Sequence, residues 1–311
     1  MTMSRSLSAV RFGAVALGLA VLFAGLPAHA QAPAANSEAA REAELNAAYE
    51  AGLTAGTRGP AKVALIDQAG LDIPADYLFV PKTEGIRIMR ALGNTISGET
   101  FEGLVVGLKP SDGWIVVVRY IKEGYIKDDE AKDWKADELL QSLKDGTEES
   151  NKDRVSRGFP EIEVIGWVEK PAYDPATHRL VWSLLNKPKG APDTGSKGIN
   201  YNTYALGRDG YFSLNLLTNS ERIGADKAVA RTLLAALTYN PGKAYEDFNA
   251  STDHIAAYGI AALVGGVVAK KLGLLALIGV FVLKFAKIIG IAVAAFLGGI
   301  WKLFGRKRSS A

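Results

Sequence analysis

The sequence predicts an α+β domain with a mainly antiparallel sheet and flanking helices, followed by a C-terminal transmembrane helix. Apolar segments recur in pairs separated by short turns, which is typical of β-hairpins. Helical segments fall between these pairs, but repeating β-α-β units are absent. The last quarter of the chain differs from the rest, because it is largely apolar and contains no acidic residue from position 255 onward.

The domain opens with a strand at residues 62–66 and a second apolar run at 77–80, and a turn is expected at 68–70. Pro81 ends the second run. The apolar spacing at 82–92 then predicts a helix, which the following Gly-Asn pair closes.

Residues 114–121 give the strongest strand signal in the chain, because they are β-branched or aromatic almost throughout. Together with residues 101–108 they predict a hairpin whose turn lies at 110–113. An acidic run at 128–137 leads into a helix that is expected at about 135–143.

The second half of the domain also consists mainly of hairpins. Alternation at 161–169 predicts a strand that pairs with 179–185 across a proline-containing turn at 171–175. The other expected elements are a hairpin of 201–206 and 211–217 about Gly207-Arg208-Asp209-Gly210, and a helix at 227–237 stopped by Asn240-Pro241-Gly242.

The N-terminus is typical of a secretory signal peptide. Arg5 and Arg11 precede an apolar stretch at 12–26, and small residues at 28 and 30 predict cleavage before Gln31. The chain has no cysteine, which excludes disulfides, thiol chemistry and a lipid anchor on cysteine. The predicted organisation is a signal peptide at 1–30, a linker running into a short helix at 31–58, an exported domain at 59–254, a membrane anchor at 255–304 and a basic cytoplasmic tail at 305–311.

The anchor allows more than one arrangement. As a helix, residues 272–297 would be ~39 Å long, which is enough to cross a bilayer. Lys284 and Lys287 lie near the middle of this run, where a charge costs at least ~2.5–3.5 kcal/mol. A single span at about 285–304 is favoured, because it leaves these lysines at the outer interface and the basic end in the cytoplasm. A helical hairpin, or a segment lying in the interface, are the alternatives.

Charge is divided unevenly along the chain. All 33 acidic residues lie between positions 31 and 254, whereas ten of the 36 basic residues lie outside that range, so the central part carries a net charge of −7. An acidic body argues against nucleic acid as a partner. The expected partners are membrane lipid and an envelope protein. The basic residues assigned to the anchor are Lys270, Lys271, Lys284, Lys287, Lys302, Arg306, Lys307 and Arg308.

The sequence contains few signals of catalysis. Only His178 and His254 remain after signal cleavage, and neither has the neighbouring ligands of a zinc site. A nucleophile elbow, a phosphate-binding loop and a dinucleotide-binding motif are all absent, so neither a cofactor nor a metal is expected.

Four residues are weak catalytic candidates: His178, Asp128, Asp129 and Asp174. The acidic run beginning at Asp128 lacks the ligand order of an EF-hand. Stabilisation of the following helix by its N-terminal acids is the favoured interpretation.

Several motifs resemble an uncharacterised bacterial family of membrane-anchored proteins, domain of unknown function 2167. The resemblance covers about residues 55–300 and implies the anchored topology and a bacterial origin, without an activity or a catalytic residue. Its motifs are Gly124-Tyr125-Ile126-Lys127-Asp128-Asp129, Gly166-Trp167, Pro171-Ala172-Tyr173-Asp174, His178-Arg179-Leu180-Val181-Trp182, Gly207-Arg208-Asp209-Gly210, Pro241-Gly242-Lys243-Ala244-Tyr245-Glu246-Asp247-Phe248 and Ala257-Tyr258-Gly259.

Two classes of function follow from these observations. The first is a non-catalytic binding or assembly module, exported and held on the outer side of the cytoplasmic membrane. The alternative is a hydrolase or carbohydrate-active enzyme that uses carboxylates together with His178, which requires a cleft where this histidine meets two acids.

Overall fold

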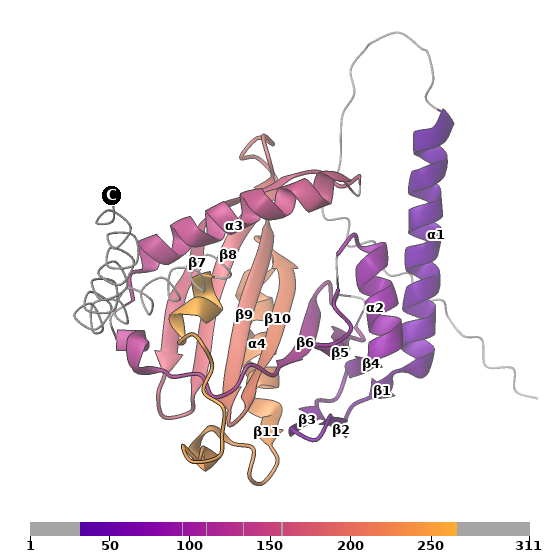
Figure 1. Ribbon diagram of the computed structural model, residues 1–311. Helices are drawn as coiled ribbons and strands as arrows, with labels where there is room; N and C mark the ends of the chain where they lie inside the picture. Colours follow the sequence, from indigo (N-terminus) through magenta and orange to yellow (C-terminus); the bar gives the residue numbers. More distant parts are fainter. Residues whose placement is uncertain (1–31, 95, 110, 133, 157, 266–311) are drawn as a thin grey trace, which may run out of the picture.

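The predicted hairpins join into one eight-stranded antiparallel sheet in the computed structural model of the chain (Figure 1). The structure describes residues 32–265, except 95, 110, 133 and 157. The strand order is β1-β4-β5-β6-β10-β9-β8-β7, which confirms the α+β class with a large antiparallel sheet. The strands are β1 (Thr57–Arg58), β4 (Tyr77–Pro81), β5 (Phe101–Gly107), β6 (Ile115–Ile121), β7 (Ile162–Asp174), β8 (Arg179–Pro188), β9 (Gly198–Gly207) and β10 (Gly210–Asn219).

The central position of β6 explains its strong strand signal. β6 pairs with β5 on one side and with β10 on the other. Val116 and Val118 pack on one face of the sheet, while Ile115 and Val117 pack on the opposite face. A strand that is covered on both faces is apolar at nearly every position.

One face of the sheet is covered by a helix and a second, smaller sheet. Helix α4 (Ile223–Ala236) packs against β9 and β10. The small sheet has the order β11-β3-β2, with β11 (Leu237–Tyr239), β3 (Ala69–Ile73) and β2 (Ala61–Leu65). The predicted turn at 68–70 was wrong, because the chain turns at 66–68 and residues 69 and 70 begin β3.

Described helices cover the other face at its two ends (Figure 1). Helices α1 (Ala32–Ala55) and α2 (Lys82–Ala91) pack over β4 and β5. At the far end, α3 (Ala136–Ser156) packs on β7, and the segment after β11 packs on β8 and β9. Two separate apolar clusters result, one beneath each group of helices.

Two helices are longer than the sequence predicts. α1 has 24 residues, where a linker and a short helix were expected. α3 has 21 residues and continues well past position 143, because its polar second half is held by a side chain rather than by an apolar stripe. Asn151 is 1% exposed; it accepts a hydrogen bond from Ile162 N at 2.9 Å and donates one to Ile162 O at 2.8 Å.

The predicted turn at 171–175 was also placed too early. β7 continues to Asp174, and the turn lies at 175–178. Pro171 is tolerated inside the strand because β7 is at the edge of the sheet, where an unpaired position costs little.

The globular body extends beyond the predicted boundary at 254. Ile260, Leu263 and Val264 are buried in the apolar cluster under α3, so the chain packs against the body up to at least residue 264. No helix among the described residues is long and apolar enough to cross a membrane. The predicted signal peptide at 1–30 and the favoured span at 285–304 lie outside the described residues.

Candidate functional site

Two of the four catalytic candidates meet in a cluster at the end of the β7–β8 hairpin. Tyr173 is the penultimate residue of β7, and its hydroxyl donates a hydrogen bond to Asp128 Oδ2 at 2.7 Å. The same hydroxyl lies 2.9 Å from His178 Nδ1, and His178 Nδ1 lies 3.7 Å from Asp128 Oδ2. Burial raises the pKa of Tyr173, so its hydroxyl keeps its proton and links the carboxylate to the imidazole.

The C-terminal segment closes the other side of this cluster. His178 Nε2 lies 3.3 Å from Glu246 Oε1, and the imidazole stacks on the ring of Tyr245 with centroids 4.0 Å apart. The Tyr245 hydroxyl donates to Ile126 O at 2.8 Å, and Tyr125 stacks on Tyr245. Three segments that are distant in sequence are therefore joined around one histidine.

The cluster meets only half of what the hydrolase alternative requires. His178 does contact two carboxylates, those of Asp128 and Glu246. However, neither of two depressions in the described part of the surface is lined by His178. One, of about 560 Å³, is lined by α3 and Glu161, and the other, of about 30 Å³, lies beneath α1.

The other two candidates have local roles in the backbone. Asp174 accepts hydrogen bonds from the Thr177 hydroxyl at 2.7 Å and from Ala176 N at 2.9 Å, and the Thr177 bond is the main reason that its pKa is lowered. Asp129 begins a short 3₁₀ helix, Asp129–Lys132. Among the described residues, no group of three or more His, Asp or Glu side chains is arranged to hold a metal ion.

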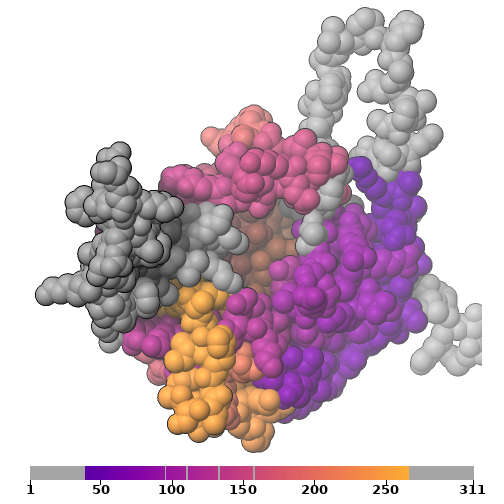
Figure 2. All heavy atoms as spheres, in the orientation of Figure 1, coloured from indigo at the N-terminus to yellow at the C-terminus, as the bar shows by residue number. Residues whose placement is uncertain are grey.

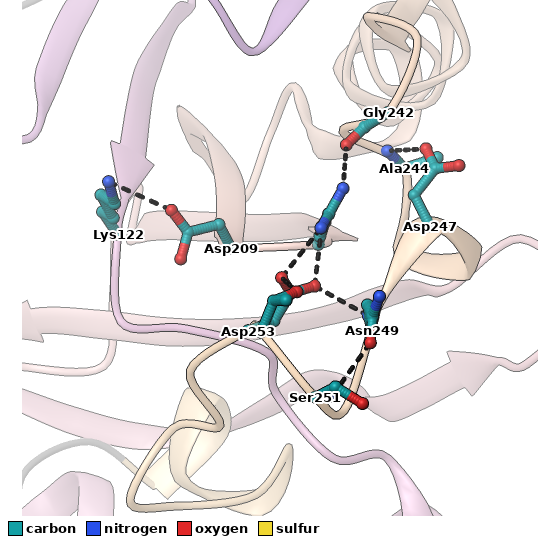
Figure 3. A network of polar contacts seen from close by, with 10 residues as sticks. Lys122, Asp209, Gly242, Ala244, Asp247, Asn249, Ser251 and Asp253 are labelled. Carbon is teal, nitrogen blue, oxygen red and sulfur yellow. Dashed lines mark hydrogen bonds and ion pairs between the residues drawn. The ribbon is translucent and has the colours of Figure 1, made fainter.

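A charged clamp holds the C-terminal segment on the sheet (Figure 3). Arg208, in the β9–β10 turn, donates to both carboxylate oxygens of Asp253 at 2.7 and 2.8 Å, and to Gly242 O at 3.2 Å. Asp253 also accepts the backbone N–H of Asn249 at 2.8 Å. This bidentate geometry fixes the segment that carries Tyr245 against His178.

Breaking this clamp should loosen the segment. In Arg208→Gln we expect the backbone amide of Asn249 to exchange hydrogen several-fold faster than in the wild type, measured by hydrogen–deuterium exchange. The hydrogen bond from Arg208 lowers the pKa of Asp253. The protection is therefore complete above the ordinary aspartate pKa and is lost as the pH falls from there through the lowered one.

Lys122→Gln is the matched control. Lys122 forms a more exposed ion pair with Asp209 at 3.1 Å in the same region (Figure 3). Exposed pairs contribute little, so exchange at Asn249 should stay unchanged. Equal acceleration in both variants would show that Arg208 does not hold the segment.

A second group of polar side chains lies on the sheet, on the face whose middle the helices leave uncovered. Strand register places Arg119 of β6 opposite Ser213 of β10, and Ser213 opposite Tyr204 of β9. In the next row, Asn215 of β10 is opposite Asn202 of β9, which is opposite Trp182 of β8. We call these six side chains the polar floor: Arg119, Ser213, Tyr204, Asn215, Asn202 and Trp182.

Two buried atoms of the polar floor have no hydrogen-bond partner among the described residues. They are Asn215 Oδ1, an acceptor, and Trp182 Nε1, a donor. The neighbouring side chains of Asn202 and Ser213 are 5% and 8% exposed. A buried polar atom without a partner costs about 1–3 kcal/mol, so these groups are costly in the unliganded protein.

Arg119 is half-buried in the polar floor. No carboxylate among the described residues forms an ion pair with it, whereas the half-buried Arg222 pairs with Asp226 at 3.2 Å. Burial lowers the pKa of Arg119, and the nearby phenols of Tyr204 and Tyr211 oppose this shift.

The surface is hollowed over the middle of this sheet face. Figure 2 shows the depression between α3 and the α1–α2 pair, with atoms of the sheet visible at its bottom. The partial exposure of Arg119, Tyr204 and Asn215 agrees with this view. The polar floor therefore borders both apolar clusters, and its residues Arg119, Tyr204 and Asn215 are partly accessible to solvent.

Comparison with known proteins places the chain in a family. The family model described as "Protein of unknown function (DUF2167)" matches residues 57–296. The chain belongs to this family. The resemblance expected from the sequence is thereby confirmed, and the DUF2167 match includes every strand of both sheets.

Other comparisons add little to the DUF2167 assignment. No curated protein matches the chain. Among solved structures, the solution structure of cyanobacterial PsbP (CyanoP) from Synechocystis sp. PCC 6803 is similar, with 11% identity and a TM-score of 0.36. The similarity covers 58% of this chain and 92% of that chain, and it is too distant to bear on function.

The candidates from the sequence did not include the polar floor of this DUF2167 protein. One signal was present, since Arg119 interrupts an otherwise apolar central strand. Asn202, Ser213 and Asn215 gave no such signal, because a polar residue in an alternating strand normally faces solvent. Only the strand order shows that these residues share one face with Arg119.

Proposed function

We propose that the protein is a non-catalytic binding module of the bacterial cell envelope, exported and held at the cytoplasmic membrane by its C-terminal tail. The observation that carries this proposal is the polar floor, a set of donors and acceptors on a rigid sheet, of which Arg119, Tyr204 and Asn215 are partly exposed. The floor contains no carboxylate, histidine or cysteine, so it suits recognition better than proton transfer or nucleophilic attack.

The uneven charge distribution supports the anchored arrangement. A body of net charge −7 gains nothing by lying on an anionic lipid surface, whereas the acid-free basic tail suits one. In this proposal one span at about 285–304 crosses the membrane, the body lies outside, and Arg306, Lys307 and Arg308 stay in the cytoplasm.

The arrangement is tested by fractionation and by protease treatment of intact spheroplasts. We expect the full chain in the membrane fraction, with its body digested from outside, and a chain lacking residues 285–311 in the soluble exported fraction. The variant Lys284→Leu/Lys287→Leu is the control and should remain in the membrane. Recovery of the full chain in the cytosol with Met1 still attached would contradict the proposal.

The His178 cluster supports a second candidate function, a hydrolase acting on glycans. Its supporting observation is the contact of His178 with both Asp128 and Glu246. If this candidate is right, the purified protein hydrolyses a glycan. The variant His178→Ala should then lose this hydrolysis while it keeps the thermal stability of the wild type. Loss of stability without any hydrolysis would assign the cluster to packing.

A further inference from the structure

The charge of Arg119 has no ion-pair partner among the described residues. A half-buried guanidinium is costly to desolvate and is normally paired with an anion. Within the described residues it has none. The segments 1–31 and 266–311 contain no Asp or Glu, so neither terminal segment can supply a side-chain carboxylate.

The surroundings of Arg119 limit the kind of anion. One guanidinium is the only cation of the polar floor, and the body around it carries a net charge of −7. A dianion such as phosphate would be opposed by this negative field, whereas a single carboxylate is neutralised by the planar fork of one arginine.

The unpartnered atoms describe the rest of the ligand. Asn215 Oδ1 requires a donor, and Asn215 lies on β10, the strand next to that of Arg119, one row along the sheet. Trp182 Nε1 requires an acceptor, and Trp182 lies in the same row as Asn215 but two strands farther, on β8. An organic molecule that carries a hydroxyl or amide group beside its carboxylate can pair with Arg119 and donate to Asn215. Trp182 lies about 14 Å across the sheet from Arg119, three strand spacings away, so a longer molecule is needed to reach it as well. The ring of Tyr204 flanks Trp182, with centroids 6.4 Å apart, and offers an aromatic surface to its carbon atoms.

We propose that the polar floor binds a small organic carboxylate, with Arg119 as the partner of its negative charge. The carboxylate is that of a free hydroxy acid or of a peptide C-terminus, which share this chemistry. The inference rests on the proposed function as a binding module and names its ligand class.

The test uses the mature full-length chain in mild detergent, with ligands added one at a time. The probes are lactate, the dipeptide alanylalanine, its C-terminal amide and inorganic phosphate. Binding is followed by tryptophan fluorescence and by the rise in Tm that a ligand of the folded state causes. We expect saturable binding of lactate or alanylalanine, and no binding of the amide or of phosphate. Lactate alone would indicate a free acid, and alanylalanine alone a peptide end.

Arg119→Gln should weaken this binding at least about tenfold, since a charge-assisted pair is lost. Arg231→Gln is the control. Arg231 is more exposed and lies on α4, at the other face of the sheet, so this variant should bind the ligands as the wild type does. Because Arg119 has no ion-pair partner among the described residues, its replacement should leave the unliganded Tm unchanged or raised. A purely structural arginine would lower it.

Three results would overturn the proposal: no saturable binding of any probe, binding that survives Arg119→Gln, or phosphate binding as tight as that of the carboxylates. The proposed function is separable from these outcomes. If an envelope protein still co-purifies with a chain that binds none of the probes, the binding module stands and the carboxylate site falls.

Discussion

Replacing Phe212 with alanine should lower the free energy of unfolding by about 3–5 kcal/mol. Phe212 of β10 is 0% exposed and packs between Tyr120 and Tyr239, with ring centroids at 4.9 and 5.7 Å. It lies in the main apolar cluster between the large sheet and α4. Truncation removes a ring that joins both sheets and leaves a cavity that rigid strands cannot close.

The measurement is equilibrium denaturation followed by tryptophan fluorescence, with Phe248→Ala as the matched control. Phe248 is half-buried and stacks on Tyr125 at the edge of the body, with ring centroids 3.9 Å apart. The same truncation there should cost clearly less. Equal losses in the two variants would mean that the sheet–α4 cluster is not the main source of stability.

The hairpins of the large sheet were predictable because each of them is local. A turn and two alternating strands lie within about 20 residues of sequence, so the pattern of the β9–β10 hairpin contains nearly all that its pairing requires. The order of the hairpins was not predictable in this way. The pairing of β6 with β10 joins segments that are about 90 residues apart, and no periodicity records it.

The small sheet escaped prediction for a related reason. β3 pairs with β11, whose first residue, Leu237, is the last residue of the helix that the sequence predicts at 227–237. Leu237 continues the apolar spacing of that helix, and only its contact with Leu71 selects the extended conformation. Tertiary pairing here overrides local propensity, as is usual for short strands.

The candidate sites also differ in how far the sequence alone could identify them. His178, Asp128 and Asp174 were identifiable by residue type, and the structure adds that two of them share the hydroxyl of Tyr173. The polar floor depends on register across four strands. Its polar residues can be assigned to one face only when the neighbours of β6 and β9 are known.

Replacing Gly210 with alanine should destabilise the protein by about 2–5 kcal/mol, because strain and overcrowding combine at this position. Gly210 is the last residue of the predicted turn and the first of β10, and it has φ +151°, a conformation that residues with a side chain rarely adopt. A Cβ atom there would lie 2.1 Å from Ile121 O at the end of β6. Relief requires β10 to move away from β6, which would also separate Ser213 from Arg119.

Gly166→Ala is the matched control, because the same substitution is not expected to destabilise the protein at this position. Gly166 lies in edge strand β7, its φ is not positive, and nothing lies within 4 Å of an added Cβ. Alanine there should be neutral or stabilise by up to about 1 kcal/mol, since it restricts the unfolded chain. Urea denaturation of both variants decides the matter. If Gly210→Ala unfolds at the same urea concentration as the wild type, the β9–β10 turn does not lie against β6 as described. The strand register that brings the polar floor together would then be wrong as well.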